Sequence, residues 1–186
     1  MTGAAGELAW SHSNDFILIA APMFIMMGEL MHRSGVSERL FSALSPWFAK
    51  VPGQLIHTNI ASSAVFAATS GSSLATAATI GTVAVPNMDK GGYNRPLFLG
   101  SIAAGGTLGI LIPPSINMII YSVLSHTSVV DLYAAGFIPG FLLAVLFSGI
   151  VLLSVMLVPS LVRGDMTEGS LWAARISGLP HLLPPL

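Results

Sequence analysis

The sequence predicts an all-α integral membrane protein that contains a re-entrant helical hairpin and a proline-broken transmembrane helix. Charged residues make up 8% of the 186 positions and hydrophobic residues 53%, whereas a soluble domain carries about 25% charged residues. Three long intervals contain no Asp, Glu, Lys or Arg, at 52–88, 96–130 and 132–162. Each is longer than the roughly 20 residues that a helix needs to cross the hydrocarbon core.

The first membrane span is predicted at residues 16–31. It follows a polar segment, 1–15, that lacks the basic start and apolar core of a signal peptide. Glu29 near the end of this span is a functional candidate, because a carboxylate is costly in hydrocarbon. Arg33 lies four residues further on the same helical face, so we expect an interfacial ion pair instead. Apolar residues at a 3-4 spacing across 36–50 then predict an amphipathic helix in the membrane plane.

Residues 54–88 are predicted to form a hairpin that enters the membrane and returns to the same side. Its tip is the run Ser70, Gly71, Ser72 and Ser73, which combines a flexible backbone with hydroxyl groups. Small residues dominate both arms, and they let helices approach closely where no hydrophobic effect drives them together. Taken alone, this run is also explained by a packing patch or a helix kink.

A broken transmembrane helix is predicted at 97–125. Pro113 and Pro114 have no N–H group, so the carbonyls of Gly109 and Ile110 lose their helical partners. Hydrocarbon cannot solvate these carbonyls, which therefore need protein, water or a cation. A last span is predicted at 132–158, giving a membrane domain at 16–160, and the charged, Pro-rich residues 161–186 are expected to be a cytoplasmic linker or tail.

Charge placement predicts the topology. If 54–88 enters and returns while the other three segments each cross the membrane, all seven basic residues share one face: Arg33, Arg39, Lys50, Lys90, Arg95, Arg163 and Arg175. The opposite face receives Glu7, Asp15 and Asp131. By the positive-inside rule, the basic face is cytoplasmic. A single crossing by 54–88 would abolish this asymmetry, so the hairpin is the preferred interpretation.

The two backbone breaks together favour a secondary transporter over a scaffold. Two opposed helix breaks are how such transporters build a site at the membrane midplane. Hydroxyl and carbonyl oxygens suit a hard monovalent cation such as Na⁺, and neither segment contains the carboxylate of a proton relay. We expect no enzyme, because the chain has no cysteine, no Asp pair and no HExxH motif. The net charge of −1 does not indicate a protein that binds nucleic acid, which usually carries a basic patch.

Five motifs in register resemble the large membrane subunit of tripartite ATP-independent periplasmic (TRAP) transporters. They are GVSERL at 35–40, FAATSGSS at 66–73, KGGY at 90–93, AAGGTLGILIPPSI at 103–116 and AGFIPG at 135–140. The resemblance implies an ion-transporter fold in which this chain is one inverted-repeat unit. It also implies Na⁺-coupled symport of organic acids such as C4-dicarboxylates by an elevator movement, in the bacterial inner membrane. The implied partners are the lipid bilayer, a small membrane subunit and a periplasmic substrate-binding protein.

The resemblance also implies a sodium site, with Na⁺ as coupling ion and no other cofactor. The matching positions are Ser70 and Ser72 at the hairpin tip and Gly109, Ile112 and Pro114 at the helix break. Gly109 is also one of the carbonyls that the prolines leave unpaired. Supporting candidates are Asn59, Gly71, Ser73, Thr107 and Ser115. Asn59 and Thr107 are the weaker of these, because buried Asn and Thr often tie helices together.

The chain departs from the family in two ways. Many members carry an acidic residue shortly after the hairpin Ser-Gly-Ser, whereas here Leu74, Ala75 and Thr76 follow Ser73, so any role of that carboxylate is absent or falls to Thr76. The family's large subunit is also about twice this length, so the second half of the permease becomes a further expected partner. The alternative interpretation is a membrane scaffold or an inactive fragment with no autonomous transport.

Overall fold

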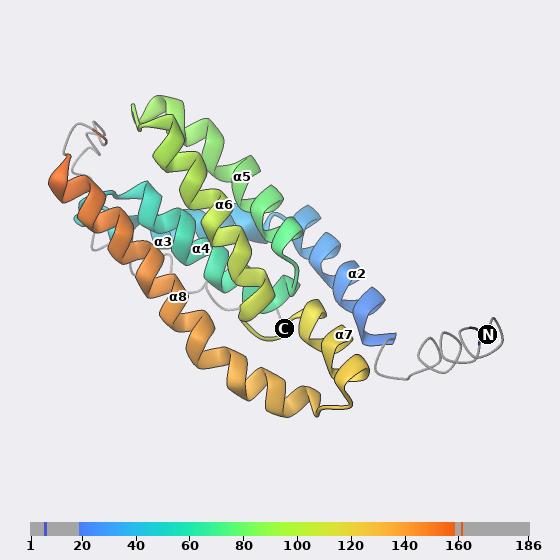
Figure 1. Ribbon diagram of the computed structural model, residues 1–186. Coiled ribbons are helices and arrows are strands. Elements are labelled where there is room, and N and C mark those ends of the chain that lie inside the picture. Colours follow the sequence, from blue (N-terminus) through green and yellow to red (C-terminus); the bar gives the residue numbers. More distant parts are fainter. Residues whose placement is uncertain (1–5, 7–18, 159–160, 162–186) are drawn as a thin grey trace.

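The computed structural model describes residue 6, residues 19–158 and residue 161, and all regular structure among them is helical. The predicted all-α class is therefore confirmed. The expected segments 1–15 and 161–186, apart from Gly6 and Leu161, lie outside the described residues, as do residues 16–18 of the first span. The helices are α2 (Ala20–Arg33), α3 (Val36–Phe48), α4 (Leu55–Ser70), α5 (Ser73–Lys90), α6 (Arg95–Leu111), α7 (Ile116–Ser125) and α8 (Val129–Leu157) (Figure 1).

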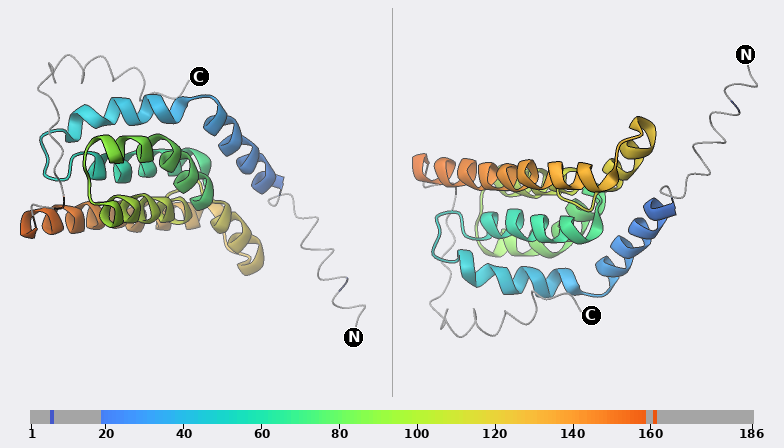
Figure 2. Two further views of the ribbon diagram at one scale, coloured as in Figure 1. Left: turned by 90° about the horizontal axis from the view of Figure 1, so that it is seen from above. Right: turned by 90° about the horizontal axis from the view of Figure 1, so that it is seen from below.

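The helices stack in layers around the hairpin formed by α4 and α5. Helix α6 packs against both hairpin arms, α3 covers the hairpin on one side, and α8 covers α6 and α4 on the other (Figure 2). Helix α2 approaches α4, α5 and α7 at an angle at one end of the layers. The apolar face of α3, with Leu40 and Phe41 each 4% exposed, is buried against the hairpin.

Helix ends follow capping groups rather than hydropathy. Helix α4 lies within the hairpin predicted at 54–88, and α5 extends two residues beyond the predicted end, to Lys90. Helix α6 begins at Arg95, two residues before the predicted span, because Asn94 Oδ1 accepts a hydrogen bond from Leu97 N at 3.1 Å. Helix α8 begins at Val129 rather than at 132, because Ser128 Oγ accepts from Asp131 N at 3.4 Å.

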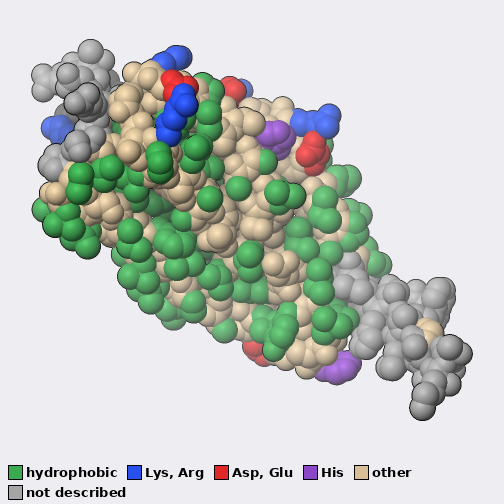
Figure 3. Space-filling view, turned by 45° about the horizontal axis from the view of Figure 1, so that its top comes forward, with side chains coloured by type: hydrophobic (Ala, Val, Ile, Leu, Met, Phe, Trp, Pro, Cys, Tyr) green, Lys and Arg blue, Asp and Glu red, His purple; other side chains and the backbone are tan. Residues whose placement is uncertain are grey.

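Within the described part of the chain, two helical stretches are long and apolar enough to cross a membrane. They are Arg95–Ser125, which includes the proline break, and Val129–Leu157. Large apolar side chains on α8, among them Phe137, Ile138 and Phe141, are 63–73% exposed, as expected of a surface that faces lipid. In the space-filling view of Figure 3, the Lys and Arg side chains gather along one rim of the molecule.

His57 fastens the base of the hairpin to α8. Its side chain is 3% exposed, its Nε2 donates to Pro52 O at 2.8 Å, and its Nδ1 lies 2.6 Å from Ser148 Oγ of α8. The ring also stacks on Phe48, with centroids 6.1 Å apart. Because Nε2 must carry the proton to bond a carbonyl, Nδ1 of the neutral ring accepts from the Ser148 hydroxyl.

We expect His57→Phe to lower the unfolding free energy by about 1–3 kcal/mol, because Pro52 O and Ser148 Oγ lose their partner while the stacking on Phe48 is kept. Thermal unfolding in detergent measures this loss. In a double-mutant cycle with Ser148→Ala, the double variant should lose less unfolding free energy than the sum of the losses in the two single variants. Strictly additive losses would contradict the direct bond between the two side chains.

Candidate functional site

The hairpin tip is a two-residue turn between α4 and α5. Gly71 adopts a left-handed conformation with φ of 61°, and its N–H donates to Ala67 O at 3.0 Å, which ends α4. Ser72 then caps α5, because its Oγ accepts from Ala75 N at 3.3 Å. The glycine supplies the positive φ without strain, and the serine satisfies one of the N–H groups at the start of the next helix.

The helix break separates α6 from α7. Helix α6 ends at Leu111, Ile112 and Ser115 have extended backbones, and α7 begins at Ile116. Since Ile112 N donates to Leu108 O at 2.8 Å and the next two residues are prolines, no following N–H reaches Gly109 O or Ile110 O. The break therefore leaves the carbonyl oxygens of Gly109 and Ile110 without a backbone N–H partner.

The tip and the break are in direct contact. Ile116 N, at the start of α7, donates to Gly71 O at 3.1 Å. A Cβ placed on Gly71 would lie 2.7 Å from Pro114 O, and a Cβ placed on Gly109 would lie 2.7 Å from the carbonyl carbon of Ser72. Glycine at both positions thus allows two backbone segments, forty residues apart in sequence, to touch.

A cluster of hydroxyl groups lies on the hairpin side of this contact. Ser70 and Thr76 are fully buried, and their hydroxyl oxygens are 3.0 Å apart. Thr76 Oγ1 donates to Ser72 O at 2.7 Å, so Ser70 must donate to Thr76 if both bonds form. Ser70 Oγ then keeps lone pairs for a further donor or a cation. Thr76, which the sequence analysis considered as a substitute for a carboxylate, is therefore part of this cluster.

The structure brings most of the predicted site residues together. Ser70, Gly71, Ser72 and Ser73 form the tip, and the backbone of Gly109 packs on Ser72 and Ser73. Pro114 O faces Gly71. At the adjoining positions of the break, the Ser115 side chain is buried with no hydrogen-bond partner among the described residues, and the Ile112 side chain packs on Gly140 of α8.

Two predicted supporting residues lie elsewhere. Asn59 Nδ2 donates to Ser101 Oγ at 2.9 Å and so ties α4 to α6, which is the role that made it a weaker site candidate. Asn59 precedes Ser70 by eleven residues, which is about 16 Å along a helix. Thr107 is exposed, and its hydroxyl bonds to Ala104 O of its own helix at 2.7 Å. Neither side chain contacts the tip.

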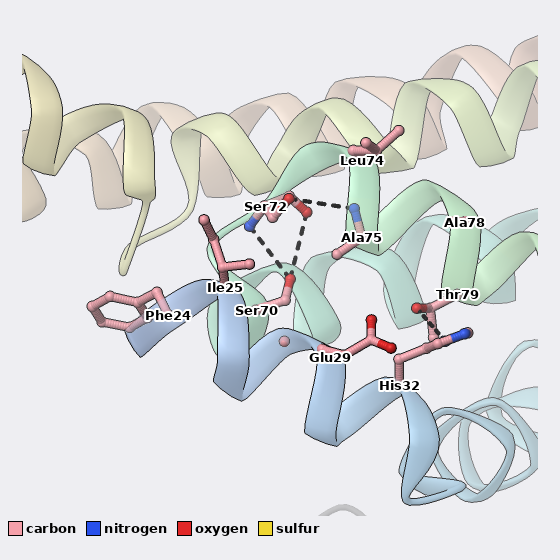
Figure 4. Close-up of a pocket in the computed structure, with 11 residues that line it drawn as sticks. Phe24, Ile25, Glu29, His32, Ser70, Ser72, Leu74, Ala75, Ala78 and Thr79 are labelled. Atoms are coloured by element: carbon pink, nitrogen blue, oxygen red, sulfur yellow. Dashed lines mark hydrogen bonds between the residues drawn. The ribbon is translucent and has the colours of Figure 1, made fainter. Parts of the chain in front are cut away.

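A cavity of about 410 Å³ opens beside the tip, between α2 and α5. Ser70 and Ser72 line one wall, and Glu29 and His32 of α2 line the opposite wall (Figure 4). His32 Nδ1 lies 2.8 Å from Thr79 Oγ1 of α5, a contact between helices that sequence analysis did not identify. The predicted pairing of Glu29 is confirmed, since its Oε1 lies 2.6 Å from Arg33 Nε.

The site consists of neutral oxygen groups. Within the part of the chain that the structure describes, no three His, Cys, Asp or Glu side chains gather as a metal site. Hydroxyl and carbonyl oxygens are ligands for hard cations, and without carboxylates they favour a cation of low charge. The tip and the break thus present hydroxyl and backbone carbonyl oxygens close together.

Comparisons with known proteins identify similar sequences along the whole chain. Residues 2–186 match the family described as tripartite ATP-independent periplasmic transporter, DctM component. The chain is 35% identical to the C4-dicarboxylate TRAP transporter large permease protein DctM of Pseudomonas aeruginosa, with 84% of the chain and 37% of the relative aligned. It is 36% identical to the ectoine TRAP transporter large permease protein TeaC of Halomonas elongata, over 91% of the chain and 39% of the relative.

A third relative has a different substrate in its name. The sialic acid TRAP transporter permease protein SiaT of Haemophilus influenzae is 38% identical, over 77% of the chain and 23% of the relative. The chain thus spans about two fifths or less of the length of these curated relatives. The three names cover chemically different substrates, so similarity alone selects none of them.

Proposed function

Because the chain belongs to the DctM component family of tripartite ATP-independent periplasmic transporters, we propose that it forms part of a sodium-coupled permease that imports organic acids. The relatives are named as transporter permeases and not as enzymes. The chain is accordingly an integral membrane transport component. Its coupling ion, its substrate and its mode of movement belong to the proposal.

The observation that carries the proposal is the contact between the hairpin tip and the helix break. Pro114 O faces Gly71, the backbone of Gly109 packs on Ser72, and the Ser70 hydroxyl lies in the same turn. Na⁺ would be held by the hydroxyls of Ser70 and Ser72 and by the backbone oxygens of Gly109, Ile112 and Pro114. The carbonyls of Gly109 and Ile110, which the prolines leave without helical partners, need a cation or a hydrogen-bond donor inside the membrane.

The proposed permease would take its substrate from a periplasmic binding protein and would work with a small membrane subunit. Relatives are named for C4-dicarboxylate, sialic acid and ectoine, all of which carry a carboxylate, so an organic acid is the substrate class we propose. The rest of the permease would complete the substrate site, since such sites form between two repeats. We place the protein in the bacterial inner membrane as a multi-pass component of an elevator-type transporter.

Sodium-dependent protection of a single cysteine tests the site. The chain has no cysteine, so Ser72→Cys introduces one thiol at a half-buried position that lines the cavity. In the assembled permease with its full partner set, Na⁺ should slow maleimide labelling severalfold relative to K⁺ at equal ionic strength. Na⁺ should also raise the melting temperature of the unmodified protein, because a ligand that binds the folded state stabilises it.

Leu74→Cys is the matched control. Leu74 lines the same cavity but is 80% exposed and lies outside the proposed ligand set. Its labelling rate should be the same in Na⁺ and K⁺. Equal rates for Ser72→Cys in the two salts, together with equal melting temperatures of the unmodified protein in Na⁺ and K⁺, would rule out a sodium site at the tip. Equal slowing of both probes would indicate a general conformational effect instead.

A further inference from the structure

A second cavity lies at the base of the hairpin, away from the tip, at the rim where basic residues gather. Its volume is about 350 Å³, and it is enclosed by α3, the start of α4 and the end of α5. Phe41, Pro46 and Leu55 supply apolar walls, while Ser42, Ser45 and Lys90 supply polar groups. The cavity thus joins an apolar interior to a polar mouth.

The polar groups of this cavity are available to a ligand. Neither the Ser42 nor the Ser45 hydroxyl forms a hydrogen bond within the described part of the chain, and Lys90 has no ion pair there. The neighbouring carboxylate of Asp89 is engaged by Arg95, with Oδ1 and Nη2 3.0 Å apart. Lys90, Ser42 and Ser45 thus line one cavity, and no Asp or Glu of the described residues lines it with them.

The position of the cavity matches the depth of lipid headgroups. Lys90 is the last residue of α5, and the Lys and Arg side chains lie along the same rim (Figure 3). Trp47 on the adjoining helix α3 is 44% exposed, as is usual for aromatic side chains at the membrane–water interface. The apolar walls of the cavity would match the acyl chains of a phospholipid, and its cationic opening would match an anionic headgroup.

Tyr93 adds no negative charge next to Lys90. Its ring packs on Gly91, which lines the cavity, and its hydroxyl donates to Gln54 Oε1 at 3.0 Å. Burial raises the pKa of the Tyr93 hydroxyl, so this group stays protonated at neutral pH. Among the described side chains that line the cavity, an anionic ligand would therefore meet hydroxyl donors and one cation but no carboxylate.

We propose that this cavity binds the phosphate headgroup of an anionic phospholipid, with Lys90 as the cationic contact and Ser42 and Ser45 as hydrogen-bond donors. The acyl chains would extend along Phe41, Pro46 and Leu55. Basic pockets between membrane helices on the cytoplasmic side recognise anionic lipids in this way. The lipid would bridge α3 and the hairpin, and its binding does not depend on the sodium site.

Photolabelling of the full 186-residue chain in detergent tests the proposal. The probe is phosphatidylglycerol with a photoreactive group in its headgroup, and peptide mapping locates the label. We expect labelling to concentrate on residues 41–46 and 87–91 and to be displaced by excess phosphatidylglycerol, but not by phosphatidylcholine or inorganic phosphate. Lys90→Gln should reduce labelling about fivefold, the contribution of one basic residue near an anionic lipid surface.

Lys50→Gln is the matched control, because Lys50 is an exposed lysine at the end of the adjoining helix and does not line the cavity. It should leave labelling unchanged. Equal losses for the two lysines would mean diffuse charge attraction, and displacement by inorganic phosphate would mean a free-anion site. Either result, or labelling spread along the chain, overturns the proposal. If Lys90→Gln does not fold, the double variant Ser42→Ala and Ser45→Ala should show the loss instead.

Discussion

Replacing Gly109 by alanine is expected to lower the unfolding free energy by about 1–3 kcal/mol, the usual cost of overpacking a tight interior, and to weaken sodium stabilisation. The added Cβ would lie 2.7 Å from Ser72 C and 2.8 Å from Ser73 N. These are backbone atoms that cannot rotate away, so the hairpin tip must move from the helix break. Thermal unfolding in detergent, with and without Na⁺, measures both effects.

Gly100→Ala is the control on the same helix. A Cβ at Gly100 meets nothing within 4 Å, and alanine has a higher helix propensity than glycine by about 1 kcal/mol. This variant should therefore be as stable as the original or slightly more stable, with an unchanged response to Na⁺. Similar losses in both variants would show that the contact between Gly109 and the tip does not determine the stability.

Gly71→Ala is expected to be at least as destabilising, because two costs add at one position. Its φ of +61° is unfavourable for alanine, and the new Cβ would lie 2.7 Å from Pro114 O. The strain costs about 1 kcal/mol, and the collision with the carbonyl adds a further overpacking cost of about 1–3 kcal/mol. The melting temperature in detergent reports the sum.

Gly35→Ala separates the two costs. Gly35 has a similar φ of +72°, but a Cβ there meets nothing within 4 Å. It should therefore show the strain alone, and the excess loss in Gly71→Ala should equal the cost of separating the tip from the break. Equal losses in the two variants would contradict the close packing of Gly71 on Pro114.

Local chemistry was enough to predict where the chain is interrupted. Glycine tolerates the positive φ at position 71, and Pro113 and Pro114 cannot continue a helix. The ends of α5, α6 and α8 differ from the predicted spans, because hydropathy reports the thickness of hydrocarbon while caps such as Asn94 decide where helices begin. The placement of Na⁺ at the tip stays a prediction.

Contacts between distant segments were harder to predict. The bond of His32 to Thr79 depends on how α2 crosses the hairpin, which no periodicity in the sequence reveals. The location of Thr107 was accessible from helical geometry alone. It precedes Gly109 by two residues, and at about 100° per residue this places the two on opposite faces of α6. The glycine face packs on the hairpin, so Thr107 points away from it.

The hydrogen bond from Ile116 N to Gly71 O makes the hairpin tip a poor gate. A gate that swung at the tip alone would break this bond and would leave the carbonyl of the buried Gly71 without its partner, at a cost of about 1–3 kcal/mol. It would also pull Ser72 away from Gly109, where the two backbones are in contact. A movement that carries Gly71 and Ile116 together, with the tip staying closed, would avoid these costs.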